Sequence, residues 1–394
     1  MKKLIAMLLA LVMVLSLAAC GASAPAATEA PKAEEPKAEA APAPEAEAPA
    51  AEEVELVWGL KPFEEKQTLR VGFFTGSPLS YPFLFADNLG IFEQLNIELE
   101  YTCFTGGPAM MEANAEWDIA SCGLGGLANG LYGYDFSLID INDYEENLAL
   151  FAREGSALAA DPTNPENWKG VTAVYPAGTT AQAVLADYLQ SIGLSLADIE
   201  SVNMDNSNAL TGFSGGTGDV LGCWNAIALS AEDAGHVRIS DSGKQGYPAP
   251  CGTFATQQIL KDNFDLVATA VAVFHLAVEW CYESEENMAQ AAQWYLDHCD
   301  EEGFLCNEDV AARTMQWYAG PTVDEYINIF TETAPDAAGK YTARELLKAE
   351  RDILVGLDLF VAEGKYTDAD RTRYLDECRI DPSVAMAVKE MLGK

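Results

Sequence analysis

The sequence predicts an α/β protein of two lobes with a helical extension at its C-terminus. Strand-like apolar runs alternate with helix-like stretches in two successive blocks, which are separated by the polar stretch 161–165. From Asn263 onward the periodicity is helical only. Because strands that alternate with helices form βαβ units, each lobe is expected to hold a mostly parallel sheet flanked by helices. The length of 394 residues also favours two subdomains over a single core.

The first block is expected to contain strands that alternate with short helices. Its first strand is buried and leads into the Gly-Ser-Pro loop 76–78. Gly90 is placed to end the first helix in the left-handed conformation, and Pro108 to begin the second. The expected strands are 69–74, 97–104, 117–121, 136–141 and 147–152, and the expected helices are 81–89, one that starts at Pro108, and one that opens at 123–126.

The second block repeats this alternation. Gly178, Thr179 and Thr180 lead from its first strand into a helix that Gly193 closes. Its expected strands are 171–175, 199–204, 219–224, 236–239 and the return strand 252–256, and the later helices are 264–281, 285–299, 310–318, 323–330 and 343–360. We therefore divide the chain into a signal (1–19), a linker (20–60), a first lobe (61–160), a second lobe (161–256), and a return to the first lobe with the C-terminal helices (257–394).

The N-terminal 55 residues have the composition of an export signal followed by a spacer. Lys2 and Lys3 precede the apolar run 4–17, which is too short to span a hydrocarbon layer of ~30 Å comfortably. The run Leu-Ala-Ala-Cys that ends at Cys20 resembles a bacterial lipoprotein lipobox, and this resemblance implies cleavage before Cys20 and lipid on its sulfur. Residues 21–55 are almost wholly Ala, Pro, Glu and Lys, so we expect a disordered spacer above the membrane.

The charge balance disfavours two classes of partner. The formal net charge is −38, which disfavours binding to nucleic acid and to anionic membrane surfaces. A small anionic ligand is not excluded, because the field of exposed charges fades beyond a Debye length of ~8 Å at physiological salt.

The cysteines and histidines show no metal-binding pattern. Three histidines are scattered along the chain without ligand spacing, and no CxxC occurs among the nine cysteines. We therefore expect no metal and no cofactor. An even number of cysteines besides Cys20 leaves both free thiols and disulfides open, and Cys299–Cys306 is the expected bridge if one forms.

An ordered set of short motifs resembles one family. These motifs are Ser77-Pro78, Leu89-Gly90-Ile91-Phe92, Ile97-Glu98-Leu99-Glu100, Gly106-Gly107-Pro108, Trp117-Asp118-Ile119-Ala120 with Gly123, Gly178-Thr179-Thr180-Ala181, and Asp219 with Trp224. Over roughly residues 69–256 the chain resembles the nitrate/sulfonate/taurine substrate-binding proteins, a group similar to the thiamine-pyrimidine-precursor binding proteins. No single motif is specific, and the resemblance rests on their order. It implies a type II periplasmic-binding fold and a monomer that hands a small solute to the permease of an ABC importer. Ala115-Glu116 depart from the family's usual Gly before the Asp.

The candidate ligand site lies in four loops at the carboxyl ends of strands, where helix N-termini point. The loop 177–181 could form a cradle of backbone N–H groups and hydroxyls for an anion or carbonyl, or Thr179 could simply cap its helix. Asp219 could be structural or could bind an amine. Because these loops hold no Arg or Lys, a monoanion with an apolar body or a neutral heterocycle fits best. The candidate residues are Phe74, Gly76, Ser77, Gly106, Gly107, Cys122, Gly123, Gly178, Thr179, Thr180, Asp219 and Trp224.

Two other function classes stay open beside a solute-binding lipoprotein, which is not an enzyme. A sensor or interaction lipoprotein could use the same fold without transport. A serine hydrolase is indicated by Gly212-Phe213-Ser214-Gly215-Gly216, which matches the nucleophile-elbow pattern G-x-S-x-G, with His236 downstream. That motif needs a preceding strand and an acid that orients the histidine, and the sequence marks neither.

Overall fold

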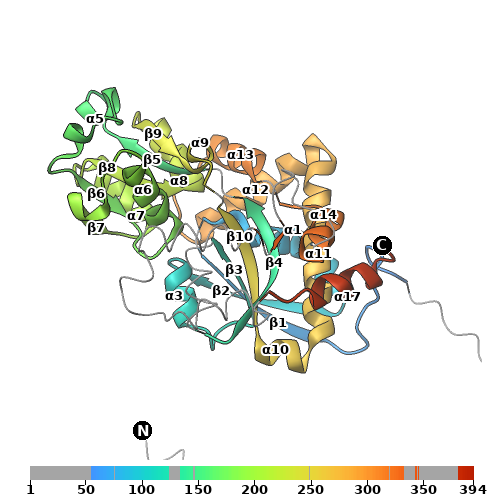
Figure 1. Ribbon diagram of the computed structural model, residues 1–394. Coiled ribbons are helices and arrows are strands. Elements are labelled where there is room, and N and C mark those ends of the chain that lie inside the picture. Colours follow the sequence, from blue (N-terminus) through green and yellow to red (C-terminus); the bar gives the residue numbers. More distant parts are fainter. Residues whose placement is uncertain are drawn as a thin grey trace, which may run out of the picture. The chain divides into compact units, whose positions relative to one another are not determined.

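The computed structural model describes residues 55–74, 76–123, 134–144, 147–247, 249–318, 320–331, 342–343, 345 and 380–394. Within them, five strands form a first sheet in the order β2-β1-β3-β10-β4 (Figure 1). Their bounds are β1 Gln67–Phe74, β2 Ile97–Phe104, β3 Ile119–Gly123, β4 Phe136–Tyr144 and β10 Pro250–Thr256. β1 pairs in parallel with β2 and β3, whereas β10 pairs antiparallel with β3 and β4. Four strands therefore run one way and only β10 runs the other.

A second sheet has the same plan, in the order β7-β6-β8-β5-β9. Its strands are β5 Leu148–Ala152, β6 Thr172–Tyr175, β7 Glu200–Asn203, β8 Val220–Trp224 and β9 Val237–Asp241. Here β5 is the reversed strand, antiparallel to β8 and β9, and the other neighbours are parallel. The predicted fold class, two mostly parallel sheets flanked by helices, is confirmed.

The chain changes sheets earlier than the boundary expected after residue 160. β5 follows β4 directly in the sequence but pairs within the second sheet, so the crossing lies between Tyr144 and Leu148. The return strand, expected at 252–256, is confirmed as β10 and brings the chain back to the first sheet. By strand pairing, the second sheet therefore comprises residues 148–241.

The predicted helices within the described residues fall close to their expected ranges. Gly90 and Gly193 adopt the expected left-handed backbone, with φ of 71° and 81°. The helices are α1 Tyr81–Asn88, α2 Ile91–Gln94, α3 Gly107–Glu112, α5 Ala157–Ala160, α6 Thr180–Ser191, α7 Asn206–Ser214, α8 Asn225–Asp233, α9 Ser242–Gln245, α10 Gln257–Asp262, α11 Phe264–Glu283, α12 Glu285–Glu301, α13 Glu308–Trp317, α14 Val323–Phe330 and α17 Ser383–Met391. Seven helices of this described part were not predicted, namely α2, α5, α7, α8, α9, α10 and α17. The signal, the spacer with Cys20, the helix expected at 123–126 and most of that expected at 343–360 lie outside the described residues.

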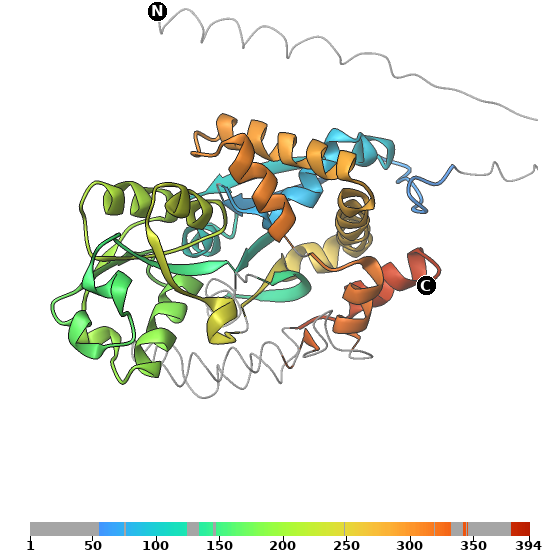
Figure 2. The same cartoon turned by 90° about the horizontal axis from the view of Figure 1, so that it is seen from above.

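The long helix α11 forms part of the core that packs against the first sheet. It contacts β1, α1, α12, α14 and α17, and Figures 1 and 2 show it in light orange with the red α17 beside it. Among the described helices, α11 has the length and apolar composition of a membrane span, but 72% of its most apolar stretch is buried in the protein. We therefore assign it as a core helix.

His275 on α11 is fully buried. Its Nδ1 lies 2.8 Å from Pro321 O, and its Nε2 lies 3.0 Å from Asp140 Oδ1.

Candidate functional site

A pocket lies where loops at the strand ends of both sheets meet. It contains about 310 Å³ of empty space, including space open to solvent. The first sheet and its loops contribute Phe74, Gly107, Pro108, Cys122 and Gly123, and the second contributes Thr179, Thr180 and Trp224. Each of these residues ends a strand or begins the helix that follows one, which is the edge where open α/β sheets collect ligands. Seven of the twelve candidate residues therefore come together, and Pro108 joins them.

Two aromatic rings contact each other across this pocket. Phe74 ends β1 and Trp224 ends β8, and their ring centroids lie 6.5 Å apart with the planes at 87°. This is the edge-to-face geometry that aromatic pairs prefer. The side chain of Asn206 positions the Trp224 backbone, because its Nδ2 donates to Trp224 O at 3.3 Å and its Oδ1 accepts from Trp224 N at 3.4 Å. Both rings are nearly buried, at 5% and 8% exposure.

The start of α6 supplies the polar part of the pocket. The N–H of Gly178, whose φ is +75°, donates to Gln182 Oε1 at 2.7 Å. The Thr179 hydroxyl donates to Pro176 O at 2.7 Å, so its side chain stabilises the preceding turn rather than capping the helix. Thr180 is 5% exposed and lines the pocket. Within the described part of the chain, its hydroxyl forms no hydrogen bond.

The glycines of the first sheet's loops differ in their placement. Gly107 and Pro108 form the first turn of α3, and Gly123 ends β3 beside the buried Cys122. Gly106 precedes α3 with an extended backbone and is not among the residues that line the pocket. The absence of a side chain on Gly107 and Gly123 leaves the backbone of these two loops exposed to the pocket. The sequence marks Pro108 as a helix start and as the end of the candidate loop 105–108, and the structure places it in the pocket lining beside Gly107.

Three candidate residues have structural contacts away from the pocket. Gly76 adopts φ of +71°, accepts from the Tyr295 hydroxyl at 2.9 Å, and lies so close to Phe304 that a Cβ would be 2.3 Å from its ring. Ser77 is 2% exposed and its N–H donates to Phe74 O at 3.1 Å. Asp219 precedes β8 and pairs with the backbone of Thr172, so it lies at the opposite end of that strand from Trp224.

Part of the chain matches a protein-family model. Residues 150–288 match the family model described as NMT1/THI5 like. This match confirms the resemblance predicted from the sequence, and it covers most of the second sheet together with the start of the C-terminal helices. A binding protein of Brucella abortus strain 2308 is 24% identical over 202 residues, which make up 50% of this chain and 61% of that protein. The chain thus spans about three fifths of the length of this curated relative.

Solved structures of solute-binding proteins share the fold. The alkanesulfonate-binding protein SsuA from Xanthomonas axonopodis pv. citri, bound to MOPS, has a TM-score of 0.60 at 17% identity over 81% of this chain and 99% of its own. The aliphatic sulphonate-binding protein SsuA from Escherichia coli has a TM-score of 0.58 at 15% identity over 77% and 91%. At these identities the likeness establishes the periplasmic-binding-protein fold.

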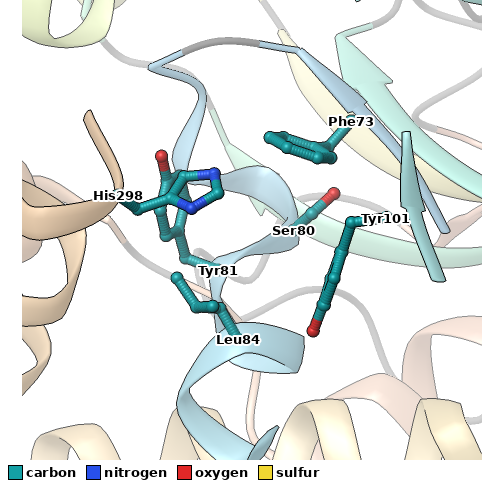
Figure 3. A pocket seen from close by; sticks show the side chains of 6 residues that line it. All are labelled: Phe73, Ser80, Tyr81, Leu84, Tyr101 and His298. Carbon is teal, nitrogen blue, oxygen red and sulfur yellow. The ribbon is translucent and has the colours of Figure 1, made fainter. Parts of the chain in front are cut away.

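A second cavity lies on the other face of β1. Consecutive strand residues point to opposite faces, so Phe73 lines this cavity while Phe74 lines the first. Figure 3 shows the rings of Phe73, Tyr81, Tyr101 and His298 around it, and the lining also includes Ser80 and Leu84. The His298 ring lies 5.2 Å from Phe73 and 5.4 Å from Tyr81, centroid to centroid. Burial lowers the pKa of His298 below its ordinary value, against the opposing charges of Glu302 and Glu301.

Among the described residues, no three His, Cys, Asp or Glu side chains are arranged to hold a metal ion. Asp118, one of the motif residues, binds the guanidinium of Arg70 through both carboxylate oxygens, at 3.1 Å and 2.6 Å. It also accepts from Arg70 N at 3.0 Å. Asp118 therefore joins the start of β3 to β1.

Proposed function

We propose that this protein is an extracytoplasmic solute-binding lipoprotein that delivers a small organic solute to an ABC importer. The observation that carries the proposal is the pocket at the carboxyl ends of the strands, to which both sheets contribute loops. Fold relatives of the chain include sulfonate-binding proteins and the ligand-binding component of an ABC-type import system from Staphylococcus aureus. A sensor lipoprotein would share the fold, and binding of a transported solute separates the two functions.

The lining of the pocket supports a sulfonate, a carboxylate or a neutral heterocycle. It includes the Thr180 hydroxyl, the first turn of α6 and two aromatic rings, but no Lys or Arg side chain among the described residues. A helix N-terminus contributes ~0.3–1 kcal/mol when exposed and up to ~2 kcal/mol when partly buried. Micromolar affinity requires about 8 kcal/mol. Contacts with Phe74 and Trp224, and the exclusion of water, must therefore supply most of the binding energy, which favours a solute with an apolar body.

Mass spectrometry of the purified, denatured protein is the first test. We expect a small acid, sulfonate or heterocycle to be released in stoichiometric amount. A protein that carries nothing would then be titrated by calorimetry with MOPS, short alkanesulfonates, carboxylates and pyrimidines. No heat and no thermal stabilisation with any of them would contradict the transport function and favour the interaction or sensor lipoprotein.

The lipid anchor is a separate part of the proposal and depends on Cys20. Expression of the full chain in a bacterium should place it in the membrane fraction with fatty acid attached, facing outward. Cys20→Ser should abolish the acylation and release the folded part from the membrane. A wild-type chain that is soluble and unacylated would overturn the anchor without affecting solute binding.

One contact favours the second candidate, a serine hydrolase. Ser214 Oγ lies 3.0 Å from His236 Nε2. However, Ser214 ends helix α7 instead of following a strand, as a nucleophile elbow requires. Burial, which is the larger cause, and the charge of Arg153 lower the pKa of His236, and within the described residues this ring donates no hydrogen bond to a carboxylate. We expect no ester turnover by the purified protein. Turnover that is lost in Ser214→Ala would establish the enzyme.

A further inference from the structure

We propose that Cys299 and Cys306 form a disulfide bond that fastens the turn between α12 and α13 behind the loop at Gly76. Both residues are thiols in this structure. Cys299 lies in the last turn of α12, and Cys306 directly precedes Asn307, the N-cap of α13. Between them Gly303 adopts φ of +69°, and Phe304 N donates to Cys299 O at 2.8 Å. The chain therefore reverses between the two cysteines.

The two thiols interact directly and differ in reactivity. The hydrogen bond between them is the largest cause of both pKa shifts: it lowers the pKa of Cys306 and raises that of Cys299, to which burial also contributes. Cys306 is partly exposed, whereas Cys299 is buried. Because the thiolate is the nucleophile, Cys306 is suited to attack an oxidant and Cys299 to resolve the product. By contrast, burial raises the pKa of Cys223 and Cys281, which disfavours their oxidation.

The oxidant is a disulfide of the extracytoplasmic space. The Cys306 thiolate attacks one sulfur of that disulfide, forms a mixed disulfide and releases the first thiol of the oxidant. The Cys299 thiol then loses its proton, attacks the Cys306 sulfur and displaces the second thiol, which takes up a proton. Two protein thiols thus become one disulfide, while the oxidant is reduced to two thiols. This inference depends on the proposed function in one respect only: the extracytoplasmic location supplies the oxidant.

The bridge would support the ligand pocket from behind. Phe304 lies within the bridged segment, and its ring packs against Gly76. Tyr295, one turn before Cys299 on α12, donates its hydroxyl to Gly76 O at 2.9 Å. Gly76 follows Phe74, which lines the pocket, by two residues. Fixing the position of Phe304 therefore restrains the loop that follows Phe74.

The test uses purified protein, first reduced and then treated with oxidised glutathione. We expect the intact mass to fall by two hydrogen atoms. Cleavage after Glu301 and Glu302 should yield fragments 287–301 and 303–308 that separate only on reduction. Oxidation should raise the melting temperature by about 5 °C, because a short loop is closed in the unfolded chain.

The matched variants are Cys306→Ser, which should lose the mass change and the thermal shift, and Cys103→Ser, which should retain both. Cys103 has comparable partial exposure but lies on β2. Fragments that separate without reduction, or a stable glutathione adduct without an internal bridge, would overturn the proposal. Because no solute is present in this experiment, its failure would leave the proposed function intact, and failure to bind a solute would leave the bridge intact.

Discussion

The indole of Trp224 and the phenyl ring of Phe74 meet edge to face, with centroids 6.5 Å apart. Each ring ends a strand of a different sheet, β8 for Trp224 and β1 for Phe74. The contact therefore links the two sheets at the pocket itself. A solute that binds there would touch both rings or separate them, so the pair should control the affinity.

Replacement of Trp224 by Leu should weaken solute binding at least tenfold, since it removes aromatic surface from the pocket. Titration calorimetry with the solute identified by mass spectrometry measures the loss. Trp294→Leu, on α12 and away from the pocket lining, serves as the control and should bind normally. In a double-mutant cycle that combines Trp224→Leu with Phe74→Leu, we expect the free energies of solute binding to show a coupling between the two rings of about 0.5–1.5 kcal/mol. Unchanged affinity in Trp224→Leu would remove this residue from the site.

The double replacement of Thr179 and Thr180 by Ala should also reduce the affinity at least tenfold, which is about 1.4 kcal/mol. Thr180→Ala removes a hydroxyl from the pocket lining, and Thr179→Ala removes the hydrogen bond to Pro176 O. Calorimetry of the two single variants would separate these effects. Thr211→Ala, at an exposed position on α7, is the matched control. An affinity equal to that of the control would exclude the α6 loop as a ligand cradle.

Gly76→Ala should destabilise the protein more than Gly155→Ala does. Both glycines have positive φ, +71° and +74°, so an alanine meets similar backbone strain of ~1–2 kcal/mol at each position. Only at Gly76 would the new Cβ meet the Phe304 ring, which adds ~1–3 kcal/mol. Thermal or denaturant unfolding gives the difference. Phe304→Ala should relieve part of the effect of Gly76→Ala, and equal stabilities of the two glycine variants would contradict the observed packing.

The stability of the wild type should fall more steeply than that of His298→Gln as the pH drops below about 6.5. Burial lowers the pKa of His298 in the folded protein. Between this lowered pKa and the unfolded value, the unfolded chain binds more protons, so protonation favours unfolding. Urea unfolding at several pH values measures the two slopes. If the free energy of unfolding changed with pH equally in the wild type and in His298→Gln, His298 would have the same pKa in the folded and the unfolded chain.

The succession of strands and helices was predictable because each depends on local patterns. Gly90 and Gly193 end helices as expected, and the candidate residues chosen from the sequence include seven of the eight residues that line the pocket. Asp219 was included among the candidates although it precedes β8. At roughly 3.3 Å per residue, the five residues of this strand place its two ends about 15 Å apart. The direction of the strand, which the sequence already implies, would have excluded Asp219.

The sequence by itself determined the α/β class, the restart of the strand–helix pattern in a second block, and the loops that carry the site, because hydrophobic periodicity and turn residues act over a few neighbouring positions. Only the tertiary structure decided that β5 joins the second sheet, that Phe304 packs on Gly76, and that Phe74 meets Trp224. A short buried strand has no local signal for its partner, and these contacts join residues far apart in the chain. Their positions follow from the packing of whole elements.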